Sequence, residues 1–355
     1  MDRFLPSRRR RISTALVLAA AGAVAVAPVA AACGGLVGEN GSIQLVRTTT
    51  LAAYSGGVER YVTSFEFSGE GGAVGSIVPL PDIPTAVERG GDWTLQRLAR
   101  EVAPPTARRS SGDAAAAELL SSAEVVLETT VDALDITILR GGGDEVGRWA
   151  LDNGFFLTPD APEVLDFYAD RSPVFMAARF DAARARALGQ TSGDGTPIMV
   201  TIPTDEPWVP LRILGLGLGE TQVVEADVFV LTDDRPRLLA GGPGLSIERS
   251  GEASEPLLDD LRSDAGMAWV PDELWLTYLR LAVPAGELRY DLAMATRPGA
   301  QPALADVGVA ATDARTPSLP DAPVRWPLVA GVLAGSLAAA VVAVAAGREA
   351  PAVAG

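Results

Sequence analysis

The sequence predicts a mainly β or α+β fold: an antiparallel, sandwich-like ectodomain with a few short helices, followed by one C-terminal transmembrane helix. Residues 33–296 contain about ten short runs rich in β-branched and aromatic residues, bounded by Gly and Pro. Only a few stretches show the apolar spacing of a helix. Residues 326–347 form an apolar run long enough to cross a bilayer.

A hairpin is expected at the start of the domain. Strands are predicted over residues 42–54 and 60–67, with a Ser-Gly-Gly turn between them. A third strand, 75–78, ends at the prolines of PLPDIP, which cannot donate ladder hydrogen bonds. Asp92 is expected to cap a helix over 93–102, whose leucines recur on one face.

The middle of the chain is predicted to alternate strands with short helices. The predicted strands are 124–130, 134–139, 174–180, 197–202, 211–218 and 223–231. The predicted helices are 144–154, 159–168 and a short one from Asp181. A late hairpin is predicted from residues 275–283 and 288–295, which flank Pro284 and Gly286.

Residues 1–32 have the three parts of a secretory signal peptide. A run of arginines precedes an uncharged apolar stretch of about 15 residues and small residues that end at Ala32. The favoured interpretation is cleavage beside Ala32 and Cys33. Lipidation of Cys33 stays open, although Ala30 stands where a lipoprotein signal usually has Leu. The arginines leave both Sec and twin-arginine export open.

The C-terminal region is divided into three parts. Residues 297–325 are a Pro/Ala-rich stalk, 326–347 are the predicted membrane span, and 348–355 are the cytoplasmic tail. A cleaved signal followed by one span places the bulk of the chain outside the cytosol, at the cell membrane. Gly331 and Gly335 form a GxxxG face that favours helix pairing, although an Ala-rich helix also shows such spacing by chance.

The composition excludes several kinds of chemistry. The 355 residues carry a net charge of −16 and contain no His and no Lys, so nucleic acid is not an expected partner. Without His or Lys there is no Ser–His–Asp triad, imidazole metal site or Schiff base. The single Cys cannot form an internal disulfide. No cofactor or metal is predicted, and carboxylate chemistry is what remains.

Several motifs are better explained as turns than as sites. GLGLGE (215–220) and AGGPGLS (240–246) lack the spacing and the Lys of phosphate-binding loops. Acidic neighbours at 233–234 and 259–260 point to opposite faces of a strand, so they are not a catalytic pair. The scattered tryptophans are typical of a β-domain core, with a carbohydrate platform as the alternative.

Three stretches resemble a known bacterial family. These are residues 75–98, which follow the CGG start and the hairpin, and, most specifically, residues 147–180 and 206–238, which contain GRWALDNGFFLTPDAPEVLDFY and EPWVPLRILG. Together they are similar to domain of unknown function 2330. The resemblance implies an exported, often C-terminally anchored protein, and it implies no reaction, cofactor or catalytic residue.

The sequence therefore favours an exported, membrane-anchored binding or scaffolding domain at the cell envelope, with other envelope proteins as partners. A carboxylate-dependent envelope hydrolase is the second hypothesis. A sensor or accessory subunit of a membrane complex, paired through Gly331 and Gly335, is the third.

Overall fold

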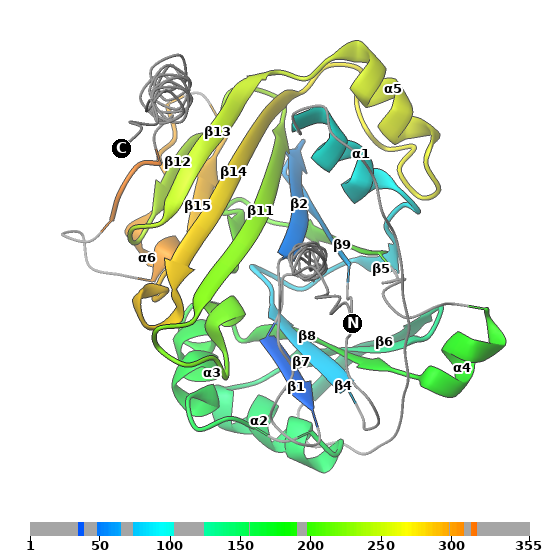
Figure 1. The fold of residues 1–355 in the computed structure, drawn as a ribbon, viewed down its shortest axis with the longest axis vertical. Coiled ribbons are helices and arrows are strands. Elements are labelled where there is room, and N and C mark those ends of the chain that lie inside the picture. Colours follow the sequence, from blue (N-terminus) through cyan, green and yellow to red (C-terminus); the bar gives the residue numbers. More distant parts are fainter. Residues whose placement is uncertain are drawn as a thin grey trace, which may run out of the picture.

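The computed structural model describes residues 35–38, 48–64, 74–102, 124–155, 157–189, 197–297, 299–308 and 314–317. The described chain forms three sheets with helices on their outer faces (Figure 1). The prediction of a mainly β or α+β fold with antiparallel sheets and few helices is confirmed at this level.

The largest sheet has seven strands. In spatial order these are β13 (Leu245–Glu252), β14 (Trp275–Pro284), β11 (Val223–Thr232), β2 (Thr48–Ser55), β3 (Val58–Ser64), β9 (Pro197–Pro203) and β5 (Ala86–Arg89). The predicted first hairpin is confirmed as β2 and β3, in which Tyr54 lies opposite Glu59. β2 and β11 run parallel, which places the N-terminal hairpin beside a strand far along the chain.

Two smaller antiparallel sheets complete the β-structure. The five-stranded sheet has the order β1 (Gly35–Gly38), β4 (Val74–Pro79), β8 (Val174–Phe180), β7 (Leu134–Arg140) and β6 (Glu124–Val131). β8 is buried along its whole length, as expected for a central strand covered on both faces. The three-stranded sheet has the order β10 (Trp208–Val209), β15 (Leu292–Ala295) and β12 (Arg237–Ala240).

Short helices cover the sheets. α1 (Thr94–Val102) and α5 (Glu255–Ser263) pack against each other and, with Leu98 and Leu261, cover one face of the seven-stranded sheet. The other face shares a larger core with the two smaller sheets. The remaining helices are α2 (Gly143–Asp152), α3 (Ala161–Ala169), α4 (Ala182–Ala187), α6 (Leu304–Val307) and the 3-10 turns η1 (Arg212–Gly215) and η2 (Ala285–Glu287).

The start of α1 is stabilised by a residue distant in the sequence. The carboxylate of Asp264 accepts hydrogen bonds from the N–H groups of Asp92 and Trp93, at 2.9 and 3.0 Å, and from the Thr94 hydroxyl at 2.8 Å. The prediction that Asp92 caps this helix is wrong, because the Asp92 carboxylate instead binds Arg89. Burial of the Asp264 carboxylate favours a higher pKa, but these hydrogen bonds stabilise the charged form more strongly, so the net pKa lies below its usual value.

Two further predictions are corrected. The strand predicted over 211–218 is instead the 3-10 turn η1 and a glycine turn, because Gly217 has a φ of +75° that an extended strand cannot contain. The prediction of a late hairpin from residues 275–283 and 288–295 is also wrong. β14 pairs with β11 and β13 in the large sheet, whereas β15 pairs with β10 and β12 in the small one.

The predicted signal peptide, membrane span and tail lie outside the described residues, as does most of the stalk. No helix within the described part of the chain combines the length and apolarity needed to cross a bilayer. Because residues 326–347 lie outside the described ranges, the membrane anchor stays a prediction.

Candidate binding pocket

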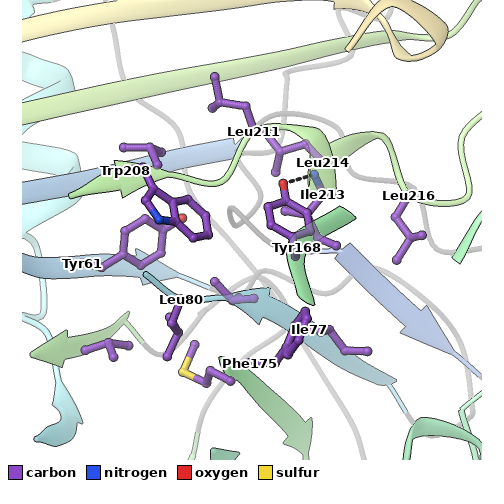
Figure 2. Packing of buried hydrophobic residues seen from close by; sticks show 14 of the residues in the cluster. Tyr61, Ile77, Leu80, Tyr168, Phe175, Trp208, Leu211, Ile213, Leu214 and Leu216 are labelled. Atoms are coloured by element: carbon purple, nitrogen blue, oxygen red, sulfur yellow. Dashed lines mark hydrogen bonds between the residues drawn. The ribbon is translucent and has the colours of Figure 1, made fainter. Parts of the chain in front are cut away.

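The segment that follows β10 connects the small sheet to a pocket. Trp208 and Val209 pair with β15, and the chain then turns through η1 with Leu211, Ile213 and Leu214 buried. Figure 2 shows these side chains packed with Tyr168 of α3, whose hydroxyl accepts a hydrogen bond from the N–H of Ile213 at 2.9 Å. The apolar residues that suggested a strand here are thus spaced to fill the core around a turn.

A buried carboxylate fixes this turn. Asp291 is fully buried, and its Oδ1 accepts hydrogen bonds from the Tyr168 hydroxyl at 2.8 Å and the N–H groups of Leu211 and Arg212 at 2.6 and 3.0 Å. Its Oδ2 pairs with the guanidinium of Arg171. Because hydrogen bonds to a charged group are strong, Asp291 joins α3, η1 and the residues before β15 into one unit.

Aromatic rings surround this ion pair. The Arg171 guanidinium carbon lies 4.6 Å from the centre of the Trp208 ring and 5.1 Å from that of Tyr168, and these two rings stack with centres 5.8 Å apart. Burial, together with the Asp291 charge, raises the pKa of Tyr168 well above its usual value. The phenol therefore stays protonated and donates to Asp291.

An open pocket of about 640 Å³ lies beside this unit. Its walls come from residues 158–164 at the start of α3, 212–220 from η1 into the glycine turn, and 285–289 in and after η2. This volume lies within the range of about 300–1,000 Å³ that is typical of small-ligand sites. The Asp291 unit fixes two of the walls, since Leu211 and Arg212 bond to it directly and α3 bonds to it through Tyr168.

Most of the charges in the pocket are already paired. Glu163 forms an ion pair with Arg212, and Asp160 accepts a hydrogen bond from the N–H of Gly217 at 2.9 Å. Arg289 is exposed, and its Nε donates to the Gly286 carbonyl at 3.0 Å, which orients the guanidinium. Neither Arg289 nor Glu220 has an ion-pair partner among the described residues, so both are available to a ligand.

The glycines of GLGLGE shape one wall of the pocket. Gly217 packs against Thr158, and a Cβ built on it would lie 2.7 Å from the Thr158 methyl carbon. Gly219 also lines the pocket, and a Cβ built on it meets no atom within 4 Å. The motif is a turn, as expected, but the sequence did not indicate that this turn lines a pocket.

The residues singled out from the sequence are not brought together by the described structure. Ala32, Cys33, Gly331 and Gly335 all lie outside the described residues, so cleavage, lipidation and helix pairing stay predictions. Within the described ranges, no three His, Cys, Asp or Glu side chains are grouped as a metal site.

Sequence reasoning missed Asp291, Tyr168 and Arg289. One signal was present for the first of them, because Asp291 is a single acid within the otherwise apolar run YDLAMA. A lone carboxylate in a core strand needs buried partners. Nothing local in the sequence identified those partners, since Tyr168 is 123 residues away.

The fold and the pocket together define a class: an α+β domain of mainly antiparallel sheets, with an open pocket of mixed charged and apolar lining at the junction of a helix and two turns. Residues 27–238 match the sequence profile of the family described as an uncharacterised protein conserved in bacteria, domain of unknown function 2330. The match covers more than half of the chain, and the chain belongs to this family, as its resemblance predicted. Two of the three pocket walls lie within the matched residues.

A comparison with curated proteins finds no match. Among solved structures, baculovirus P35 is similar with 10% identity over 72% of this chain and 98% of that chain, at a TM-score of 0.37. A mutated baculovirus P35 after caspase cleavage is similar with 8% identity over 70% of this chain and 99% of that one, at a TM-score of 0.35. At these TM-scores the likeness carries no argument about function.

Proposed function

We propose that the protein is an exported, membrane-anchored binding domain of the bacterial cell envelope, and that its ligand occupies the pocket between α3, the 215–220 turn and η2. The observation that carries the proposal is the pocket of about 640 Å³, held open by a buried ion-pair unit and offering Arg289 and Glu220, which form no ion pair within the described ranges. The predicted signal peptide and C-terminal span supply the export and the anchor.

The pocket chemistry favours a ligand with charges of both signs. Arg289 offers guanidinium donors that suit a carboxylate, and Glu220 offers an acceptor that suits an amine or a hydroxyl. A short peptide or amino-acid-bearing envelope fragment has both groups. Backbone carbonyls and N–H groups of the glycine turn add neutral hydrogen-bonding partners.

A pocket-blocking substitution tests the proposal. In Gly219→Phe the new side chain starts in open space at the pocket wall, so the fold should tolerate it while the ligand loses its place. Gly251→Phe is the matched control, because Gly251 lies in β13, away from the pocket, and its Cβ position is equally free of neighbours.

The measurement compares these variants as full chains in detergent. Fragments of the bacterial envelope, including stem peptides, are screened by calorimetric titration. Binding is expected to the wild type and to Gly251→Phe and to fall at least tenfold in Gly219→Phe. Equal binding by both variants would show that the ligand binds elsewhere.

The hydrolase hypothesis has less support from the pocket. It needs two carboxylates facing one substrate bond. Of the three acids that line the pocket, Glu163 is paired with Arg212 and Asp160 holds the glycine turn, which leaves Glu220. The favoured function is therefore binding.

A further inference from the structure

A second candidate site lies on the opposite side of the seven-stranded sheet, around Arg60 of β3. The Arg60 side chain leaves the sheet on the face covered by α1 and α5, and its guanidinium carbon lies 4.6 Å from the centre of the Trp269 ring. Neither residue lines the pocket described above. Whatever Arg60 binds is therefore independent of the proposed function.

Arg60 differs from the other arginines that are removed from solvent. It is half-buried, yet its guanidinium makes no hydrogen bond or ion pair with any part of the chain that the structure describes. Burial lowers the pKa of Arg60, and no acidic group in the described ranges opposes that effect. Every other arginine whose side chain is described as buried or half-buried has a carboxylate partner: Arg97, Arg171, Arg179, Arg184, Arg212, Arg249 and Arg262.

The contact with Trp269 does not engage the N–H donors of the Arg60 guanidinium. The guanidinium lies over the Trp269 ring in a cation–π contact, and its N–H donors bind no other group among the described residues. Thr201 lies directly opposite Arg60 on β9, and its hydroxyl has no hydrogen-bond partner within the described ranges. On the other side of Arg60, β2 contributes only the small Ala53. Arg60 and Thr201 thus lie side by side on the same face of the sheet, with Trp269 against the guanidinium.

We propose that Arg60 and Thr201, with Trp269 as a platform, bind an oxyanion: a carboxylate or a phosphate group presented by a ligand. A cation that has lost part of its hydration is unfavourable without a counter-ion, and the described chain supplies none. A forked guanidinium with a neighbouring hydroxyl suits the paired oxygens that both anions present. The stacked indole holds the fork in place and so lowers the entropy lost on binding.

Thermal unfolding of the full chain in detergent tests the site. Sodium acetate or inorganic phosphate is added at constant ionic strength, balanced with chloride, because a ligand of the native state raises the melting temperature. We expect a saturable rise with at least one anion. A response to acetate alone assigns a carboxylate, a response to phosphate alone assigns a phosphoryl group, and a response to both assigns oxyanions in general.

Substitutions locate the effect. Arg60→Gln should weaken the apparent affinity at least tenfold, Arg60→Lys should weaken it less because the charge stays and the fork is lost, and Thr201→Val should also weaken it. Arg280→Gln is the control, since Arg280 is exposed, has no carboxylate partner among the described residues and lies on β14. No response in the wild type, or an equal response in Arg60→Gln and Arg280→Gln, would overturn the proposal.

Discussion

Glu59 is the group whose substitution tests the structure most directly. It is fully buried in β3, on the face that packs against the two smaller sheets, and neither carboxyl oxygen has a hydrogen-bond partner among the described residues. Burial raises its pKa to about 8, and the nearby backbone of Trp208 offsets only part of this effect. The native chain therefore keeps this proton at neutral pH.

The size of the effect follows from proton linkage. An unfolded Glu59 loses its proton above about pH 4.5, whereas the folded one keeps it to about pH 8. Between these values native stability falls by about 1.4 kcal/mol for each pH unit. The loss relative to pH 4.5 is about 3 kcal/mol at pH 7 and about 4 kcal/mol at pH 8. The stabilising contribution is complete at low pH and is lost as pH rises.

Glu59→Gln removes the titration and nearly keeps the shape. Urea unfolding of the full chain is measured at several pH values. The free energy of unfolding of Glu59→Gln, relative to that of the wild type, should rise by about 3 kcal/mol from pH 4.5 to 7. The control is Glu88→Gln, an exposed residue on β5 of the same sheet, which should follow the wild type. Parallel pH profiles for the wild type and Glu59→Gln would refute the buried, protonated carboxyl. An infrared band of a protonated carboxyl at pH 7, absent from Glu59→Gln, would support it.

Three further substitutions test the packing described above. Asp264→Ala should destabilise the chain by about 2 kcal/mol at pH 7, because the N–H groups at the start of α1 lose their acceptor. Since the pKa of Asp264 is lowered in the folded chain, this difference in stability should shrink as pH falls below about 4 in the same urea series. Tyr168→Phe should cost about 1–3 kcal/mol in chemical denaturation, since Asp291 and the Ile213 N–H lose a partner, and an unchanged midpoint would contradict the network. Leu98→Ala should cost about 2–5 kcal/mol by leaving a cavity under α1, whereas the exposed Leu151→Ala should change the midpoint little.

Local pattern was sufficient for much of the fold. The β2–β3 hairpin, the fully buried strand β8 and helices α1, α2 and α3 fall where composition and periodicity placed them, within the usual few residues at the ends. These elements depend on the spacing of apolar side chains and on turn residues between them. Both are properties of neighbouring positions in the sequence.

Prediction from pattern was not sufficient where an apolar run had no fixed partner. Residues 211–218 are rich in Leu and Ile, as a strand often is, yet they turn, because Tyr168 and Asp291 bind their backbone groups. The same limit applies to 275–295, where two good strands belong to different sheets. Alternation shows which side chains are buried but does not show against which strand.

The sequence by itself determined the acidic character of the chain, its missing His and Lys, its family and most of its strands and helices. Only the tertiary structure decided the parallel pairing of β2 with β11, the capping of α1 by Asp264 and the pocket. It also decided that the Asp291 carboxylate is fully partnered, whereas the side chains of Glu59 and Arg60 have no hydrogen-bond partner in the part of the chain that the structure describes. The physical reason is range. Secondary structure follows from residues a few positions apart, whereas the Asp264 cap joins groups about 170 positions apart, so the chain must fold before they meet.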